Sequence, residues 1–177
     1  MRANSLRPDS VMPGIMPRHP DGGFSMMEAL AVMAVFAILA TLAVPSYLEK
    51  IVRDQIVEAL ALADIAKPPI ASAWAGAQPL PADNAAAELP IPDKIVNYFV
   101  SSVAVRAGAI DITFGNRANG ALKGKILTLR PAVVDDAPVV PVTWVCGYAA
   151  APDKMMVKGT NSTNVEARYL PQKCRAT

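Results

Sequence analysis

The pattern of hydrophobic and polar residues divides the chain into an apolar stretch, an amphipathic stretch and a series of short alternating segments. Residues 24–45 contain a single charged residue, Glu28. An α-helix of this length would extend roughly 33 Å, which matches a bilayer hydrocarbon core of about 30 Å. Arg2, Arg7 and Arg18 precede it, and basic flanks stay in the cytoplasm. The pattern therefore predicts one membrane-spanning helix with its N-terminus inside the cell.

Beyond Pro45 the helix pattern continues to residue 67 but becomes amphipathic. Pro45 itself removes a backbone donor and crowds the preceding turn, so a bend or weakened hydrogen bonding is expected there. The two prolines at 68 and 69 are expected to end or interrupt the helix. Because an isolated amphipathic helix is marginal in water, its apolar stripe needs a packing partner. This stripe consists of Leu48, Val52, Ile56, Ala59, Leu60 and Ala63.

The segments after the helix predict a sheet. A proline-rich loop over residues 68–93 comes first, and four segments rich in β-branched or alternating residues follow. Short links with Gly or Pro favour antiparallel pairing. The order of long helix, loop and strands predicts an α+β fold, in which a four-stranded antiparallel sheet packs on the amphipathic half of the helix. The expected strands cover residues 94–106, 109–114, 125–130 and 139–146 within a sheet region 94–146.

Cys146 and Cys174 are the only cysteines of the chain. On the outer side of a membrane, an even pair of cysteines predicts a disulfide. It would close residues 146–174 of a polar C-terminal region, residues 146–177, and this enclosed segment has little periodicity and would otherwise fray. The chain-entropy estimate for a loop of this size is roughly 3–4 kcal/mol. A redox or zinc role is the alternative for these two residues.

Composition narrows the class of function. The single histidine, His19, lies ahead of the apolar stretch, which counts against a histidine-based triad, general base or metal site. No cofactor is expected, and a structural protein is favoured over an enzyme. The formal net charge of +2 gives no strong signal for nucleic acid. Basic residues in the C-terminal region could contact DNA phosphates, although a solvated rim is the plainer interpretation; they are Lys154, Lys158, Arg168, Lys173 and Arg175.

Glu28 is costly inside an apolar stretch, and no basic residue follows it there. The dipeptide Gly22-Gly23 is flexible, so a protease could hold it in an extended form. Cleavage after Gly23 would give Phe24 a free α-amine, four residues ahead of Glu28 and on the same helix face. The sequence thus predicts a processing site followed by an acid that a new N-terminus can neutralise. In the alternative interpretation, Glu28 has no special role and lies in the lipid headgroup layer.

The sequence GGFSMMEAL, the apolar run after it and VPSY resemble the class III signal of type IV pilins. The resemblance implies that a prepilin peptidase removes a leader, residues 1–23, by cutting after Gly23, and methylates Phe24. It implies that Glu28 acts in assembly and that Pro45 kinks the helix. The strand sequences IDITF, LTLRP and VTWVCGY and the ending YLPQKCR resemble the head and the disulfide-bounded C-terminal region of type IVa pilins, which implies a pilin roll.

By this resemblance the chain is expected to be a prepilin, held in the inner membrane as a single-pass, N-inside precursor. Pilus assembly machinery would then build it into an extracellular homo-oligomeric filament. Such a fibre serves adhesion to a host-surface receptor, twitching motility or DNA uptake. Related alternatives are a minor pilin, a type II secretion pseudopilin and a DNA-binding competence pilin. The plainer alternatives are a secretory signal peptide in residues 1–43 and an anchored protein that keeps residues 1–23.

Overall fold

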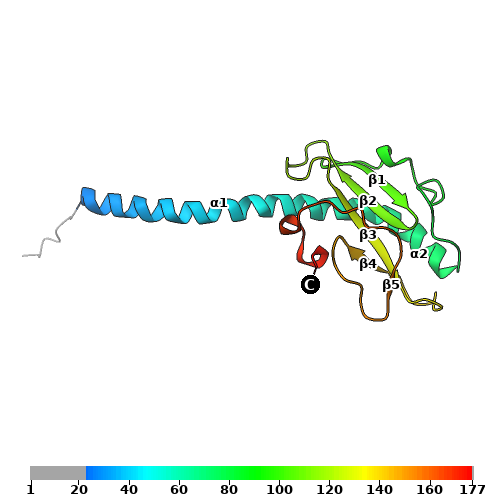
Figure 1. Cartoon of the computed structure of the whole chain (residues 1–177). Coiled ribbons are helices and arrows are strands. Elements are labelled where there is room, and N and C mark those ends of the chain that lie inside the picture. The colour runs from blue at the N-terminus through cyan, green and yellow to red at the C-terminus, as the bar shows by residue number, and fades with distance from the viewer. Residues whose placement is uncertain (1–22, 177) are drawn as a thin grey trace, which may run out of the picture. The chain divides into compact units, whose positions relative to one another are not determined.

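The computed structural model describes residues 23–176, and for residues 42–46 it describes the backbone alone. The chain divides into two compact units, Met1–Ala40 and Thr41–Thr177. Helix α1 (Met26–Ala63) begins in the first unit and continues into the second (Figure 1). Ser25 precedes it, and its Oγ accepts a hydrogen bond from the Met27 amide at 3.2 Å. This bond caps the helix, because the first-turn amides have no partner within the helix itself.

The first part of α1 carries the predicted membrane span. Among the described residues, no helix is long and apolar enough to cross a membrane. The span predicted over residues 24–45 includes residues 42–46, whose side chains lie outside the described residues, and it stays a prediction. The backbone is helical through Pro45. The kink predicted at Pro45 likewise stays a prediction.

The helix predicted to run to residue 67 ends earlier, and a second helix follows it. A 3-10 turn, Asp64–Ala66, separates α1 from α2 (Lys67–Ala75). Pro68 and Pro69 lie in the first turn of α2, where proline is tolerated because the amide there needs no partner within the helix. The two prolines therefore begin the second helix, whereas the sequence pattern predicted an end or interruption there, with a further helical turn or two possible over residues 70–76.

Four consecutive strands form an antiparallel meander, as predicted. Their order in the sheet is β1-β2-β3-β4, so β1 and β4 are its edges (Figure 1). Ala107 and Gly108, both with positive φ, make the tight turn between β1 and β2. A fifth strand of two residues pairs with β3. The bounds are β1 (Val100–Arg106), β2 (Ala109–Phe114), β3 (Ile126–Val133), β4 (Thr143–Cys146) and β5 (Met156–Val157).

Two of the predicted strands begin later than expected. The segment from residue 94 forms a 3-10 turn and an irregular stretch before β1 begins at Val100. The side-chain oxygen of Asn97 accepts bonds from the amides of Phe99 and Val100, which holds this stretch in a turn. β4 begins at Thr143, after Pro141, because a proline cannot donate to the strand ladder.

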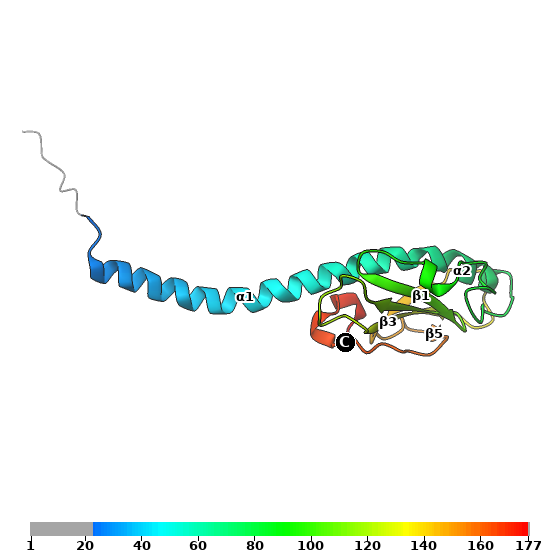
Figure 2. The same ribbon diagram turned by 90° about the horizontal axis from the view of Figure 1, so that it is seen from above.

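One face of the sheet packs on the amphipathic part of α1 and on α2, as Figure 2 shows for the second unit. Val52, Ile56 and Ala63 of the predicted stripe are buried there, and Ile70 of α2 joins them. Leu48, predicted to belong to the stripe, is exposed instead. The sheet side of this core consists of Val103, Val105, Ile110, Ile112, Phe114, Leu127 and Leu129, among others.

The loop between α2 and the sheet is anchored to the edge of β1 by Asn84. Its side-chain oxygen accepts a bond from the Val105 amide at 2.6 Å, and its nitrogen donates to the carbonyls of Val103 and Pro90. Asn84 is only 5% exposed. The side-chain amide thus pairs with an edge strand as a neighbouring backbone would, and it covers part of an edge that could otherwise aggregate.

Replacing Asn84 with alanine is expected to lower the free energy of unfolding by about 2–3 kcal/mol, since it leaves a buried amide and two carbonyls without a partner. Asn84→Asp keeps the acceptor for Val105 but sets a carboxylate against both carbonyls, so a loss of similar size is expected. Denaturant unfolding of the purified chain in detergent measures both. An exposed neighbour, Ala86→Ser, is the control, and equal stability of all three variants would contradict this account.

Candidate functional site

The predicted processing site lies in an open part of the chain. Gly23 has no regular secondary structure, and a Cβ added to it would meet nothing within 4 Å. Phe24 is 75% exposed. Gly22 lies outside the described residues. An exposed peptide bond outside secondary structure is what a protease needs in order to hold the chain in extended form.

Glu28 lies in the first turn of α1 and is exposed. A carboxylate is favoured there, because the first turn carries a partial positive charge. Within the described residues no ion pair involves Glu28. Phe24 precedes the helix by two residues. The predicted approach of its α-amine to Glu28 concerns a chain cut after Gly23, and it stays a prediction.

The described residues of the first unit form an apolar surface that the unit itself does not cover. Every side chain from Phe24 to Thr41 is exposed, and most are apolar. Soluble monomers rarely expose contiguous apolar patches larger than a few hundred Å². Lipid or other protein must cover this helix. Its exposed large apolar residues are Phe24, Met26, Met27, Leu30, Val32, Met33, Val35, Phe36, Ile38 and Leu39.

The charged side of α1 in the second unit makes local pairs. Lys50 Nζ donates to the Asp54 carboxylate at 2.8 Å, one helical turn away. This hydrogen bond and the negative charge of Asp54 raise the pKa of Lys50 above its usual value. Because the pair is exposed to water, it adds little to stability. The pairing keeps this side of the helix soluble.

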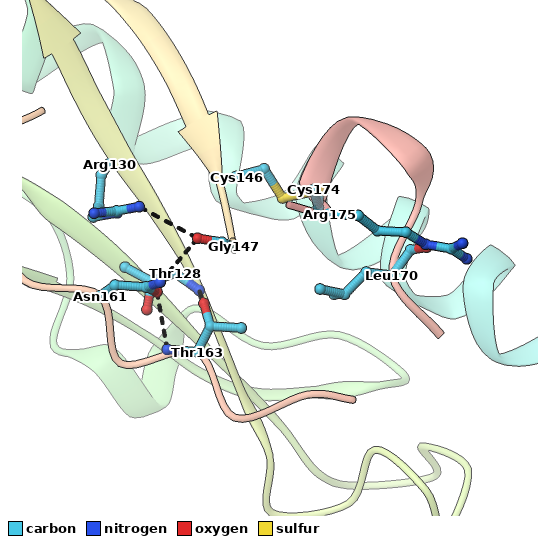
Figure 3. Close-up of a disulfide and its surroundings, with 9 residues drawn as sticks. All are labelled: Thr128, Arg130, Cys146, Gly147, Asn161, Thr163, Leu170, Cys174 and Arg175. Carbon is cyan, nitrogen blue, oxygen red and sulfur yellow. Dashed lines mark hydrogen bonds between the residues drawn. A yellow bond between two sulfur atoms is a disulfide. The ribbon is translucent and has the colours of Figure 1, made fainter. Parts of the chain in front are cut away.

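Cys146 at the end of β4 is bonded to Cys174 near the C-terminus, with a Cα–Cα distance of 4.5 Å. Both residues are buried. Figure 3 shows the bond between them and the residues around it. Gly147 follows with φ +57°, and a Cβ at this position would approach the Cys174 carbonyl oxygen to 2.8 Å. Only glycine therefore fits where the chain turns beneath the disulfide. The predicted disulfide is present.

Polar bonds hold the segment between the cysteines on the second face of the sheet. Thr163 Oγ1 accepts a bond from the Thr128 amide, and Asn161 donates to the Gly147 carbonyl (Figure 3). Thr128 Oγ1 accepts from the Ser162 amide and donates to the Asp111 carboxylate at 2.7 Å. The C-terminal region thus covers the face of the sheet that the alternation of residues along the strands predicts to be exposed to water.

This cover explains two buried polar residues that sequence reasoning missed. Alternation along residues 109–114 sets Asp111 opposite Ile110 and Ile112 and so predicts that it faces water, but it is only 2% exposed, and Thr128 is fully buried. Arg106 Nε lies 3.6 Å from the Asp111 carboxylate and supplies a charge partner. The missed signal is a cluster of Asn, Ser and Thr at 160–164, which can bond the backbone and hydroxyls of a strand.

The end of the chain is tied to α1. Arg175 donates to the carbonyls of Leu170 and Arg168, at 2.8 and 2.9 Å. Arg53 of α1 also donates to the Arg168 carbonyl, at 3.2 Å. Lys158 and Arg168 pair with Asp135 and Glu166. Most basic residues of the C-terminal region are thereby engaged within the chain. In the described residues no cluster of His, Cys, Asp and Glu could hold a metal ion.

Comparison with known proteins matches both parts of the chain. The family model "Pilin (bacterial filament)" matches residues 52–175, and the prokaryotic N-terminal methylation motif matches residues 18–44. Fimbrial protein EcpC of Eikenella corrodens is 32% identical over 158 residues, covering 86% of this chain and 90% of that protein. The type IV major pilin protein PilE of Neisseria gonorrhoeae is 29% identical over 159 residues, covering 86% and 93%. A fimbrial protein of Neisseria meningitidis serogroup B is 28% identical over 162 residues, with the same coverage.

Proposed function

The chain belongs to the pilin family of bacterial filament proteins, and we propose that it is the repeating subunit of a type IV pilus. It is a structural subunit and not an enzyme. The relatives are named fimbrial protein or type IV major pilin, which favours a major subunit over a minor pilin or a pseudopilin. The observation that supports filament assembly best is the exposed apolar surface of residues 24–41, which none of the described residues covers.

Processing comes before assembly in this proposal. A membrane-embedded peptidase hydrolyses the peptide bond after Gly23 and releases the leader 1–23. It then transfers a methyl group from a separate methyl donor to the new amine of Phe24, which gives up a proton. The match of the methylation motif to residues 18–44 supports this order, and so does the open chain at Gly23. The apolar helix holds the precursor in the inner membrane, since lipid covers the surface that water would not.

In the assembled fibre the same surface is covered by neighbouring helices. On assembly, Glu28 moves from water or the lipid headgroups into an apolar core, where burying an unpaired carboxylate would cost free energy. We place the α-amine of Phe24 from a neighbouring subunit against it. The absence of an ion pair to Glu28 within the described residues and the position of Phe24 outside the helix support an intermolecular partner.

The surface role of the fibre is adhesion, twitching motility or DNA uptake. DNA binding has little support, because the chain engages Lys158, Arg168 and Arg175 in its own contacts. A gel shift with sheared fibres is therefore expected to show only weak binding to DNA that is lost as salt rises.

Electron microscopy of sheared surface material tests the function. Cells that express the chain are expected to yield filaments in which it is the most abundant protein, and cells without its gene should lack them. Re-expression of the gene is the control. If deletion leaves filaments of normal number and the chain is only a trace component, it is not the repeating subunit.

A further inference from the structure

The loop between β2 and β3 contains an asparagine that is followed directly by a glycine. We propose that Asn119 is a site of spontaneous deamidation, in which the backbone nitrogen of Gly120 attacks the Asn119 side chain. The reaction needs no enzyme and replaces a neutral side-chain amide by a carboxylate. It goes beyond the proposed function, because it depends on the folded loop and not on assembly.

The attacking group, the Gly120 amide, makes no hydrogen bond within the described residues. The amides on either side of it are both engaged, that of Asn119 with Gln55 Oε1 at 2.9 Å and that of Ala121 with Asn119 Oδ1 at 3.0 Å. Gly120 is exposed, and a Cβ added to it would meet nothing within 4 Å. Water can therefore reach this amide and remove its proton, and no side chain crowds the nitrogen.

The Asn119 side chain is fixed through its oxygen and not through its nitrogen. Oδ1 accepts the bond from the Ala121 amide, whereas Nδ2 makes no hydrogen bond within the part of the chain that the structure describes. This bond ties the side chain to the residue after Gly120 and so keeps its carbonyl group beside the Gly120 backbone. It also withdraws electron density from Cγ, which makes that carbon a better target for the nitrogen.

Deamidation at this position is an intramolecular displacement. Water or hydroxide takes the proton of the Gly120 amide, and the nitrogen forms a bond to Asn119 Cγ. The bond from Cγ to Nδ2 breaks, and Nδ2 takes a proton from water and leaves as ammonia. Water then opens the resulting five-membered succinimide at Cγ, which gives aspartate, or at the main-chain carbonyl carbon, which gives isoaspartate. The net change is the gain of one water and the loss of one ammonia.

Positive charge in the same loop favours this reaction. Residues 115–125 contain Arg117, Lys123 and Lys125 and no acid. None of these three forms an ion pair within the described residues. The deprotonated amide, the tetrahedral intermediate and the final carboxylate are all negative, so cations in the loop stabilise them relative to the neutral asparagine.

The other asparagines of the described residues are held in ways that oppose the reaction. Asn164 precedes Val165, which is fully buried and whose branched side chain crowds its own nitrogen. The remaining ones donate hydrogen bonds from Nδ2, the leaving group, and none precedes a glycine; they are Asn84, Asn97, Asn116 and Asn161. Among the described asparagines, only Asn119 combines a free leaving group with an unhindered nucleophile.

The two products differ in their effect on the loop. The main-chain carbonyl of Asn119 accepts bonds from the amides of Leu122 and Lys123, at 2.8 and 3.0 Å, and Leu122 is fully buried in the core. Aspartate keeps this carbonyl and adds only a charge. Isoaspartate carries the main chain through Cβ and Cγ, so the former carbonyl becomes a free carboxylate and the turn is lost. Isoaspartate therefore loosens the loop, and it accumulates with the age of the chain.

Mass spectrometry of the aged chain tests the proposal. The purified full chain is incubated in detergent, at neutral and at mildly alkaline pH, and digested with trypsin, which separates Asn116 from Asn119 by cutting at Arg117. The Asn119 peptide is expected to convert to aspartate and isoaspartate about tenfold faster per unit of pH, since the deprotonated fraction of the amide grows by that factor. The Asn116 peptide is the internal control and should stay unmodified.

Gly120→Ala is the matched variant. It should fold like the wild type, because the added Cβ meets nothing within 4 Å. It is expected to slow deamidation of Asn119 about tenfold or more, since the methyl group crowds the attacking nitrogen. An unchanged rate in this variant or equal rates at Asn116 and Asn119 would overturn the proposal. So would a folded chain that stays intact while the urea-unfolded chain reacts.

Hydrogen exchange tests the effect on the loop. In aged chain that contains isoaspartate, the amides of Leu122 and Lys123 are expected to exchange faster than in fresh chain. Asn119→Asp adds the same charge but keeps the main chain, so these two amides should exchange as in fresh wild type. Equal exchange in all three samples would overturn the loosening of the loop.

Discussion

Glu28→Val is expected to abolish fibres while the subunit still accumulates in the membrane. In the account above, this acid neutralises the Phe24 amine of a neighbouring subunit within the apolar fibre core. Removing one partner of a buried ion pair costs about 3–5 kcal/mol, because the other charge stays buried and unpaired. That cost corresponds to a loss of assembly of about two orders of magnitude or more at each addition step.

The measurement is the amount of chain in sheared fibres relative to the amount in total membranes, by immunoblot. Glu28→Asp keeps the charge and should retain part of the yield, whereas Glu28→Gln should behave like valine. Thr41→Val, also in α1 but uncharged before and after, is the control for a change of polarity in the helix. Normal fibres from Glu28→Val would remove the acid from the assembly mechanism.

Removing the disulfide through Cys146→Ser/Cys174→Ser is expected to lower the free energy of unfolding by roughly 3–4 kcal/mol. The disulfide closes the segment that covers the second face of the sheet through Thr163, Asn161 and Ser162. When this segment frays, Asp111 and Thr128 lose their cover. Val165 and Leu170 anchor the later part of the segment in the core, whereas residues 158–164 are held mainly by polar bonds, so these residues should detach before the sheet unfolds.

Denaturant unfolding of the full chain in detergent measures the loss, and hydrogen exchange locates it. Faster exchange is expected across residues 158–164 and at the Thr128 amide, with β1 and β2 less affected. Ala150→Ser, an exposed position between the cysteines, is the control. Unchanged stability together with unchanged exchange in 158–164 would show that the polar bonds hold the segment without the disulfide.

Most of the fold could be predicted from the local periodicity of hydrophobic residues. The amphipathic stripe from Val52 to Ala63 was predicted because helical spacing reports burial directly. The disulfide was predictable because two cysteines allow a single pairing. The end of α1 could not be predicted, because Pro68 and Pro69 are compatible both with a helix end and with the first turn of a new helix. The two-residue strand β5 has no pattern that could reveal it.

The features that could not be predicted from the sequence depend on contacts between segments that are far apart in the chain. From the sequence, Asn84 is predicted only to lie in a loop. Its hydrogen bonds to the backbone of Val103 and Val105 become evident only when the position of β1 is known. Asp111 reads as solvent-facing, because alternation along a strand cannot show that the C-terminal region covers both it and Thr128. The candidate site at the N-terminus could be proposed from the sequence for the opposite reason: Gly23, Phe24 and Glu28 are close in sequence and need no fold to bring them together, and their roles stay predictions.

Mass spectrometry of the N-terminal peptide from purified surface fibres tests the central claim most directly. The account predicts that every subunit begins at Phe24 and that its amine is methylated, because only a chain cut after Gly23 carries the charge that Glu28 requires. Subunits that retain residues 1–23, or that begin at another residue with a free amine, would contradict it.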